Sequence, residues 1–264
     1  MSRYDFRTTR LFVEVPLAVG VMVPLERDQT NYLVNVLRMK PGAPVLVFNG
    51  RDGEWRAELA QAGKKSFALG VADRTREQAP AGDLHYLFAP LKHERLDYMV
   101  QKAVELGVSR LQPVLTQHTQ VNRVNLDRMR ANAIEAAEQC GVLSIPDIGE
   151  PMTFARALAA RKPDRLLVFC DEDAEVKDPL KALADARESP SAQLPLTMAG
   201  ATTAGRQPVA LLIGPEGGFA EEERAALLKQ TNMVRLSLGP RILRADTAAV
   251  AALAVVQAVL GDWH

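Results

Sequence analysis

The spacing of apolar residues along the 264-residue chain indicates two regions of different secondary structure. In residues 1–76, the apolar runs "APVLVFNG", "EWRAELAQA" and "FALGVAD" predict short strands, and "NGRDG" and "GKKS" predict turns between them. A helical segment, "RDQTNYLVNVLRM", interrupts this β-rich region with apolar residues at Tyr32, Leu33, Val36 and Leu37. Several short strands at close spacing predict a small β-barrel.

Residues 77–83, a polar stretch that contains proline and glycine, form the predicted linker to a second domain at 84–264. There the pattern alternates between buried strands, such as "LHYLFAPL", "DRLLVFCD" and "PVALLIG", and helices. This alternation predicts an α/β domain with a parallel sheet. Residues 187–208 are rich in Ala, Ser, Thr, Gly and Pro without a sustained period, and we expect a mobile surface insertion there.

Three predicted helices of the second domain have identifiable faces or ends. "ERLDYMVQKAVELG" ends at Gly107 as a C-terminal cap, and its apolar face consists of Leu96, Met99, Val100, Ala103 and Val104. "NLDRMRANAIEAAEQCG" has Asn125 or Asp127 as its N-cap and ends before Gly141. The closing helix, "TAAVAALAVVQAVLG", is apolar nearly all round, so we expect it to be covered on most sides.

Charge and cysteine usage narrow the function classes. The formal net charge is zero, which argues weakly against nucleic-acid binding because phosphate contacts need cations. Residues 1–76, however, hold 12 Lys and Arg against 8 Asp and Glu, which suggests a basic module joined to a neutral or acidic one. Cys140 and Cys170 form no CxxC pair and the four histidines lack ligand spacing, so no metal site is predicted. No apolar run is long enough to span a membrane, and we expect a cytoplasmic protein with reduced thiols.

The stretch "LLIGPEGGFAEEE" places a glycine-rich loop between a buried strand and a helix. Its glycines do not have the GxGxxG spacing, and no Lys-Ser/Thr pair follows them as in a Walker loop. The helix begins near Ala220 with three glutamates, Glu221, Glu222 and Glu223, which suit the helix dipole but would repel a phosphate. The loop therefore favours a phosphate-free ligand, including a cationic one, although a purely structural turn stays open.

A second junction, "LSLGPRILRADTAA", follows the next predicted strand. Arg241 and Arg244 bracket an Ile-Leu pair directly after the strand end, where parallel α/β sheets bind ligands. Two arginines at this position suit a phosphate or an anionic base. Asp246 or Thr247 can cap the final helix, and for Asp246 both capping and catalysis stay open.

The two junctions, in this order, resemble the bacterial 16S rRNA uridine N3-methyltransferases of the SPOUT superfamily. Four further segments, "TTRLFVEV", "LVNVLRMKPGAPVLVFNG", "KHERLDYMVQKAVELGV" and "IEAAEQCG", are similar to segments of the same family. The resemblance therefore runs along most of the chain.

This resemblance implies a PUA-like barrel that grips RNA at 1–76 and a SPOUT methyltransferase domain at 84–264. It implies that the C-terminal chain threads a loop to form a trefoil knot, and that two chains form a homodimer. The implied cofactor is S-adenosylmethionine, which carries a sulfonium cation and no phosphate, in agreement with the acid-led helix. The implied substrate is 16S rRNA in the small ribosomal subunit.

The resemblance also implies roles for individual residues. Arg241 and Arg244 are the expected catalytic residues, stabilising negative charge on the uracil ring. The expected RNA contacts are Arg10, Arg38 and Lys92. The expected cofactor-binding residues are Leu212, Ile213, Gly214, Pro215, Glu216, Gly217, Gly218, Leu238, Gly239, Arg241, Ile242 and Leu243.

The chain departs from the family pattern at several positions. Ala220 stands where Ser or Thr is frequent, so a side-chain N-cap is absent, and Asp246 stands where Glu is common. Val142 and Leu143 follow the "EQCG" glycine where a basic residue is frequent. The matched motifs offer no evident His or Cys base. The alternatives are a SPOUT enzyme for another rRNA or tRNA nucleotide, a non-catalytic RNA-binding assembly factor, and a nucleotide-binding α/β enzyme of another kind.

Overall fold

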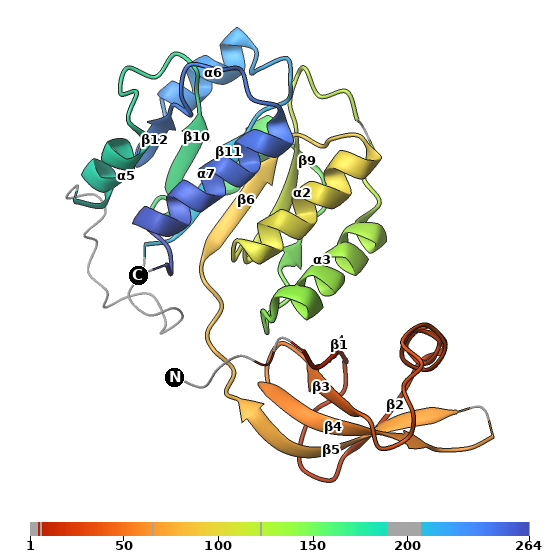
Figure 1. The fold of residues 1–264 in the computed structure, drawn as a ribbon. Coiled ribbons are helices and arrows are strands. Elements are labelled where there is room, and N and C mark those ends of the chain that lie inside the picture. Colours follow the sequence, from red (N-terminus) through yellow and green to blue (C-terminus); the bar gives the residue numbers. More distant parts are fainter. Residues whose placement is uncertain (1–4, 6, 65, 122, 189–206, 264) are drawn as a thin grey trace. The chain divides into compact units, whose positions relative to one another are not determined.

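The computed structural model describes residues 5, 7–64, 66–121, 123–188 and 207–263 (Figure 1). The chain forms two compact units. Unit 1 comprises Met1–Ala79 and Ala137–Ile145, and unit 2 comprises Pro80–Ala136 and Pro146–His264. The segment Ala137–Ile145, which we expected in the second domain, thus groups with unit 1.

Most of the expected insertion at 187–208 lies outside the described residues.

Unit 1 contains the β-rich region that the sequence predicts. Its five-stranded sheet has the order β1-β3-β4-β5-β2, in which only β1 and β3 pair in parallel. The sheet curls but stays open, because β1 and β2 form its two edges among the described residues (Figure 1). The strands are β1 (Arg10–Phe12), β2 (Met22–Pro24), β3 (Pro44–Phe48), β4 (Glu54–Gln61) and β5 (Phe67–Arg76).

Alternating residues of these strands build the core of unit 1. The register pairs Val45 with Ala57 and Leu59 with Leu69, so apolar residues of β3, β4 and β5 meet on one face. Leu33 closes this core from outside the sheet and is fully buried. The period-two pattern of the sequence thus predicts the buried face correctly.

The helical segment of unit 1 differs from the expectation in its winding. It starts as the short helix α1 (Arg27–Thr30) and continues as the π-helix η1 (Asn31–Val36), in which the Leu37 amide bonds the Tyr32 carbonyl. A π-helix has more residues per turn than an α-helix, so apolar residues spaced for an α-helix do not share one face. Only Leu33 of the predicted face is buried, and Val36 and Leu37 are 61% and 39% exposed.

Unit 2 is an α/β layer structure with a parallel sheet, as predicted. Its seven-stranded sheet has the order β12-β10-β11-β6-β7-β8, and β9 also pairs with β7. All these pairs are parallel. The strands are β6 (Leu84–Phe88), β7 (Arg110–Leu115), β8 (Asp147–Ile148), β9 (Met152–Thr153), β10 (Leu166–Cys170), β11 (Val209–Ile213) and β12 (Met233–Leu236).

The helices of unit 2 cover this sheet. Figure 1 shows α2 and α7 side by side across the sheet, and α7 also contacts α5 and β11. On α2, all five predicted apolar residues are buried, and Gly107 after its end has a φ of 76°. The helices are α2 (His93–Glu105), α3 (Leu126–Cys140), α4 (Phe154–Ala160), α5 (Pro179–Glu188), α6 (Glu221–Leu228) and α7 (Ala245–Val259).

The structure tests the predicted N-cap of α3 and the predicted burial of α7. Asn125 rather than Asp127 caps α3, because its side-chain oxygen accepts a hydrogen bond from the Arg128 amide at 3.0 Å. On α7, Ala252, Leu253 and Val256 are buried. Ala254 and Val255 are only half-buried, so the single chain does not cover this apolar helix completely.

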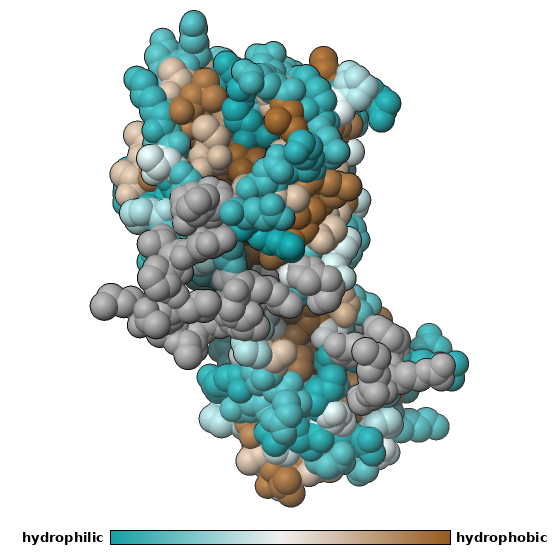
Figure 2. All heavy atoms as spheres, turned by 90° about the vertical axis from the view of Figure 1, so that its left-hand side faces the viewer, coloured by the Kyte–Doolittle hydropathy of each residue, from teal (hydrophilic) through white to brown (hydrophobic). Residues whose placement is uncertain are grey.

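The surface of the described residues is mixed. Figure 2 shows hydrophobic residues in small groups among hydrophilic ones on one side of each unit. None of the described helices combines the length and the apolar character that crossing a membrane requires.

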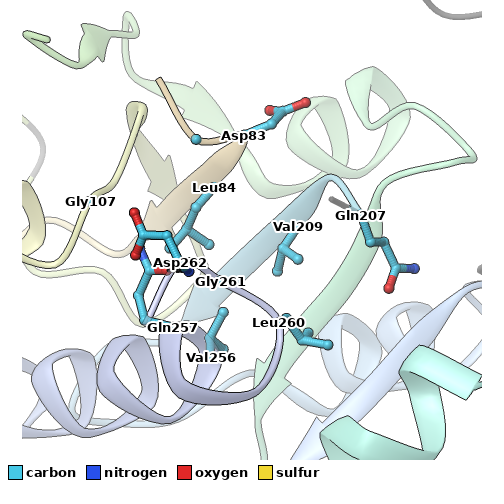
Figure 3. Close-up of a pocket in the computed structure, with 11 residues that line it drawn as sticks. Asp83, Leu84, Gly107, Gln207, Val209, Val256, Gln257, Leu260, Gly261 and Asp262 are labelled. Atoms are coloured by element: carbon cyan, nitrogen blue, oxygen red, sulfur yellow. Dashed lines mark hydrogen bonds between the residues drawn. The ribbon is translucent and has the colours of Figure 1, made fainter. Parts of the chain in front are cut away.

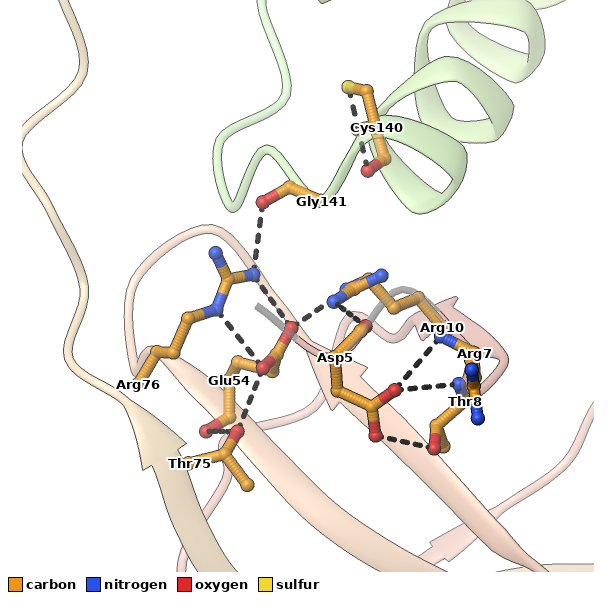
Figure 4. A network of polar contacts seen from close by, with 10 residues as sticks. Asp5, Arg7, Thr8, Arg10, Glu54, Thr75, Arg76, Cys140 and Gly141 are labelled. Atoms are coloured by element: carbon orange, nitrogen blue, oxygen red, sulfur yellow. Dashed lines mark hydrogen bonds and ion pairs between the residues drawn. The ribbon is translucent and has the colours of Figure 1, made fainter. Parts of the chain in front are cut away.

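A buried ion-pair network holds the end of the unit 1 sheet together (Figure 4). Glu54 lies 2.8 Å from Arg10 Nε and 2.6 Å from Arg76 Nη2, and it also accepts a hydrogen bond from Thr75. Arg76 donates in addition to the carbonyl of Gly141. Burial raises the pKa of Glu54, but the hydrogen bonds from Arg76 and Arg10 outweigh it and lower that pKa overall. The carboxylate therefore stays ionised between two cations.

Replacing Glu54 by alanine is expected to lower the free energy of unfolding of unit 1 by about 3–5 kcal/mol, because Arg10 would stay buried without its partner. Glu54→Gln keeps a hydrogen-bond acceptor and should lose less. Denaturant titration followed by Trp55 fluorescence, in a Trp263→Phe background, measures this change.

Glu58→Ala is the matched control, since Glu58 is an exposed residue of the same strand. It should change the unfolding free energy by less than about 0.5 kcal/mol. Equal effects of the two alanine variants would contradict a structural role for the network.

Candidate functional site

The parallel sheet of unit 2 brings several loops to one edge. We call the edge at the carboxyl ends of its strands the carboxyl edge. Both junctions singled out in the sequence lie there, at 214–220 after β11 and 237–244 after β12. Residues 116–119 after β7 and the polar segment after β10 lie at the same edge. Open parallel sheets bind ligands at this edge, so it is the candidate site.

The first loop is a tight turn that depends on glycine. The Gly218 amide bonds the Pro215 carbonyl at 2.9 Å, and Gly218 has a φ of 72°. At Gly214, a Cβ atom would lie 3.0 Å from the Phe219 ring. A side chain at Gly214 would thus crowd the Phe219 ring, and one at Gly218 would adopt a strained backbone, which favours main-chain groups facing a ligand.

Glu223 takes the place of the missing N-cap of α6. Ala220 occupies the cap position, and one Glu223 carboxylate oxygen accepts a hydrogen bond from its amide at 3.0 Å. The other oxygen accepts from the Gln117 amide at 2.9 Å. One carboxylate therefore joins the start of α6 to the loop after β7.

Two further contacts fasten the same loop. His118 Nδ1 lies 3.2 Å from the carbonyl oxygens of both Gly217 and Gly218. Arg95 of α2 forms an ion pair of 3.6 Å with Glu216, and both side chains are substantially exposed. An exposed pair of this kind contributes at most about 1 kcal/mol, so it orients the loop tip more than it stabilises it.

The segment after β10 supplies a buried carboxylate beneath the site. Asp171 is 7% exposed and accepts hydrogen bonds from Arg235 Nε at 2.7 Å and Arg224 Nη2 at 3.2 Å. Arg235 also donates to the carbonyl of Asp173. The cluster joins β12 and α6 to the end of β10, and so fixes the helix that follows the first loop and the strand that precedes the second.

The second loop is open to solvent. Ser237 is buried at its start, Gly239 has a φ of 95°, and Ile242 is 95% exposed. Arg241 and Arg244 are exposed, and neither forms an ion pair with another residue that the structure describes. Both guanidinium groups are thus available to a ligand.

The start of α7 corrects the predicted cap. The N-cap is Arg244, which makes no side-chain cap, so neither Asp246 nor Thr247 occupies that position. The helix begins two residues earlier than a cap at Asp246 would allow. Asp246 lies in the first turn, where its carboxylate accepts the Thr247 amide at 3.0 Å and suits the helix dipole.

The three expected RNA contacts differ in accessibility. Arg38 and Lys92 are exposed, and Arg38 has the left-handed φ of 54°. Arg10 is 5% exposed and is held by Glu54 and the Asp5 carbonyl. Its guanidinium is committed inside unit 1, so we leave Arg10 out of the RNA surface.

Sequence reasoning did not single out residues 116–119 or Asp171. In both cases the signal was a polar stretch directly after a predicted buried strand, "TQHT" and "DED". Such stretches occur at every strand end, and only the pairing order of the sheet places these two beside the glycine loop.

A small pocket lies at the opposite edge of the sheet (Figure 3). It has a volume of about 30 Å³ and is lined by the start of β6 and β11 and the end of α7. Gln257 fills one wall, donating to the Leu106 carbonyl and accepting from the Asp262 amide. The space suits a single water molecule, so the pocket is structural.

Among the described residues, no group of three His, Cys, Asp or Glu side chains is placed to hold a metal ion.

Family sequence models match both units. A family described as an RNA methyltransferase domain matches residues 77–257, and one described as an RNA methyltransferase PUA domain matches residues 25–71.

Individual proteins are similar over nearly their whole length. Ribosomal RNA small subunit methyltransferase E of Rickettsia conorii is 27% identical over 249 residues, which is 94% of each chain. A methyltransferase structure from Legionella pneumophila with bound SAM is 28% identical, with a TM-score of 0.75, and covers 96% of this chain and 98% of its own. A Neisseria gonorrhoeae structure with a TM-score of 0.79 shares the fold at 24% identity, covering 98% and 100%.

Glu223→Ala is expected to loosen both loops that its carboxylate joins. Each lost charge-assisted hydrogen bond costs roughly 1.5–3 kcal/mol, so amide exchange in 214–219 and 116–119 should be faster by about tenfold or more. Hydrogen–deuterium exchange measures this change. Glu222→Ala, an exposed neighbour in the same turn, is the control and should leave exchange unchanged. Unchanged exchange in the Glu223 variant would contradict the bridging role.

Proposed function

Because this chain belongs to the RNA methyltransferase family, we propose that it transfers a methyl group from S-adenosylmethionine to N3 of a uridine in 16S rRNA of the small ribosomal subunit. Relatives named ribosomal RNA small subunit methyltransferase E, matched from end to end, support the RNA class. The observation that carries the proposal is the pair of loops at the carboxyl edge. The acid-led helix behind the first loop suits a cationic, phosphate-free cofactor, and the two arginines of the second loop suit an anionic base.

The residues at the carboxyl edge fit S-adenosylmethionine. The loop after β11 presents main-chain groups, and the helix behind it opens with three glutamates. These acids favour a sulfonium cation and disfavour a phosphate. When bound, the cofactor supplies an electrophilic methyl group. We propose that it is held by Leu212, Ile213, Gly214, Pro215, Glu216, Gly217, Gly218, Leu238, Gly239, Arg241, Ile242 and Leu243.

Arg241 and Arg244 are the proposed charge-stabilising residues. The N3 proton of uracil must leave before or during methyl transfer, and negative charge then develops on O2 and O4. A permanently protonated guanidinium close to these oxygens stabilises that charge. Both side chains are exposed and form no ion pair with a described residue, which supports this role.

Arg38 of unit 1 and Lys92 of unit 2 are the proposed RNA contacts. Lys92 lies on the rim of a cleft of about 580 Å³ between the starts of α2 and α3. Leu91, Leu96 and Met129 give the cleft apolar walls, and Arg123 adds a second cation. A volume of this size and a cationic rim suit an unstacked nucleotide.

We also propose a homodimer and a knotted C-terminal chain. The incompletely covered apolar face of α7 supports the dimer, since a second copy would bury it. Light scattering that gives the mass of one chain would contradict it. The knot stays a prediction from the family resemblance.

The direct test uses small subunits from a strain that lacks the protein. Incubation with labelled S-adenosylmethionine should place the label on N3 of one uridine in 16S rRNA, mapped by nuclease digestion and mass spectrometry. Label on another base or atom would refute the uridine N3 proposal. No detectable S-adenosylmethionine binding by calorimetry would favour a non-catalytic assembly factor.

Arg241→Ala and Arg244→Ala are each expected to lower kcat about 10²–10³-fold, because each removes a donor to the developing charge. Single-turnover methylation of small subunits measures the effect. Arg156→Ala, an exposed arginine on α4, is the matched control and should keep the wild-type rate. Wild-type rates for both site variants would exclude charge stabilisation by these arginines.

A further inference from the structure

The imidazole of His118 is held in one orientation at the carboxyl edge. It follows β7, is exposed to solvent, and has Nδ1 within 3.2 Å of two carbonyl oxygens, those of Gly217 and Gly218. The Cβ of His118 also lies 3.3 Å from the position of a Cβ at Gly217, so ring and loop pack closely. Any movement of the glycine loop therefore carries the imidazole with it.

The two carbonyl oxygens decide the tautomer of His118. A carbonyl oxygen only accepts hydrogen bonds, so Nδ1 must donate and must carry the proton. In the neutral ring, the lone pair then resides on Nε2. In its neutral form His118 thus presents Nε2 as a nitrogen base at the loop proposed to hold the cofactor.

Three of the carboxylates near this loop already have hydrogen-bond or ion-pair partners. Glu223 accepts two backbone amides, one at each oxygen. Glu216 faces Arg95, and Asp246 accepts the amide of Thr247. These three carboxylates are therefore each oriented by a donor, whereas Nε2 of His118 accepts no hydrogen bond from a residue that the structure describes.

Two buried side chains near the sheet are unsuitable as bases. Burial raises the pKa of Cys170 to about 12 and the pKa of Tyr86 well above its ordinary value, so both stay protonated at neutral pH. Of the histidines whose side chains are described, His85 lies at the start of β6, and only His118 lies at the carboxyl edge.

We propose that Nε2 of His118 accepts the N3 proton of the target uracil; this rests on the proposed function. The N3–H bond breaks, its proton moves to Nε2, and its electron pair stays on the ring nitrogen. That pair forms the new bond to the methyl carbon, while the carbon–sulfur bond breaks and its electrons go to sulfur. The imidazolium then returns its proton to water.

This assignment predicts a pH dependence with a defined sign. A protonated Nε2 cannot accept a proton, so kcat should rise with pH to a plateau in the wild-type protein. The charged groups on the elements next to His118 are Glu216 on the glycine loop, Glu223 on α6, which accepts the Gln117 amide, and Arg95 on α2, which pairs with Glu216. If His118 is the base, the rise of kcat at low pH (the acidic limb of the profile) should not depend on any of these three groups.

The decisive variant is His118→Gln. Its side-chain amide still donates to the carbonyls of Gly217 and Gly218 but cannot accept a proton at neutral pH. We expect kcat to fall about 100-fold, the acidic limb of the pH profile to disappear, and the Kd for S-adenosylmethionine to change little. In His118→Ala, added imidazole should restore rate in proportion to its neutral form. His85→Gln is the matched control and should keep both the rate and the limb.

Any other outcome contradicts the assignment of His118 as the proton acceptor. A His118→Gln protein with the wild-type kcat and pH limb removes His118 from proton transfer. A variant that loses cofactor affinity in proportion to rate, or keeps the limb at a lower rate, shows that His118 only positions the loop. If the wild-type protein labels an atom other than uridine N3, the proposed function fails and the proton-transfer role with it. If wild type labels N3 but the variants match it, only the role of His118 fails.

Discussion

The parallel pairing of β10, β11 and β6 is the constraint on which the candidate site depends. Val209 of β11 pairs with Leu166 of β10 on one side and with Leu84 of β6 on the other, and all three strands run in the same direction. Their carboxyl ends therefore meet at one edge, although they are far apart in sequence. The loops that leave this edge have main-chain groups without strand partners, which is why polar ligands are bound there.

Side chains then fix these loops to different degrees. The base of the site is firm, since Asp171 is buried and accepts from two arginines of other elements. The middle is joined by Glu223, which accepts from two loops. The tip is held by the exposed pair of Arg95 and Glu216, which is weak. The site is thus held firmly by the buried Asp171 contacts and loosely by the exposed Arg95–Glu216 pair. For the proposed function, this arrangement would permit a bulky cofactor to enter while the binding groups of the site stay aligned.

The sequence predicts most elements of the fold because their apolar periods are strong. It fails for η1, where a change of hydrogen-bond pattern alters which residues share a face without changing the composition of the segment. It also does not predict the burial of Arg10, because the partner of Arg10, Glu54, is 44 residues away and leaves no local signal. Likewise, the contact of His118 with Gly217 spans 99 residues and follows from the strand order alone. The roles of individual cofactor-binding and RNA-binding residues stay predictions, because they come from family resemblance.

Unit 1 has one further property with consequences for how the protein is made. Arg76 bonds the carbonyl of Gly141, and the Phe12 amide bonds the carboxylate of Glu138, so a segment from much later in the chain completes a sheet formed by the first 76 residues. During synthesis, the five strands leave the ribosome well before this segment does. While β6, α2 and β7 are translated, the sheet lacks the hydrogen bonds to Glu138 and Gly141. A fragment that ends at residue 79 would lack these two bonds permanently.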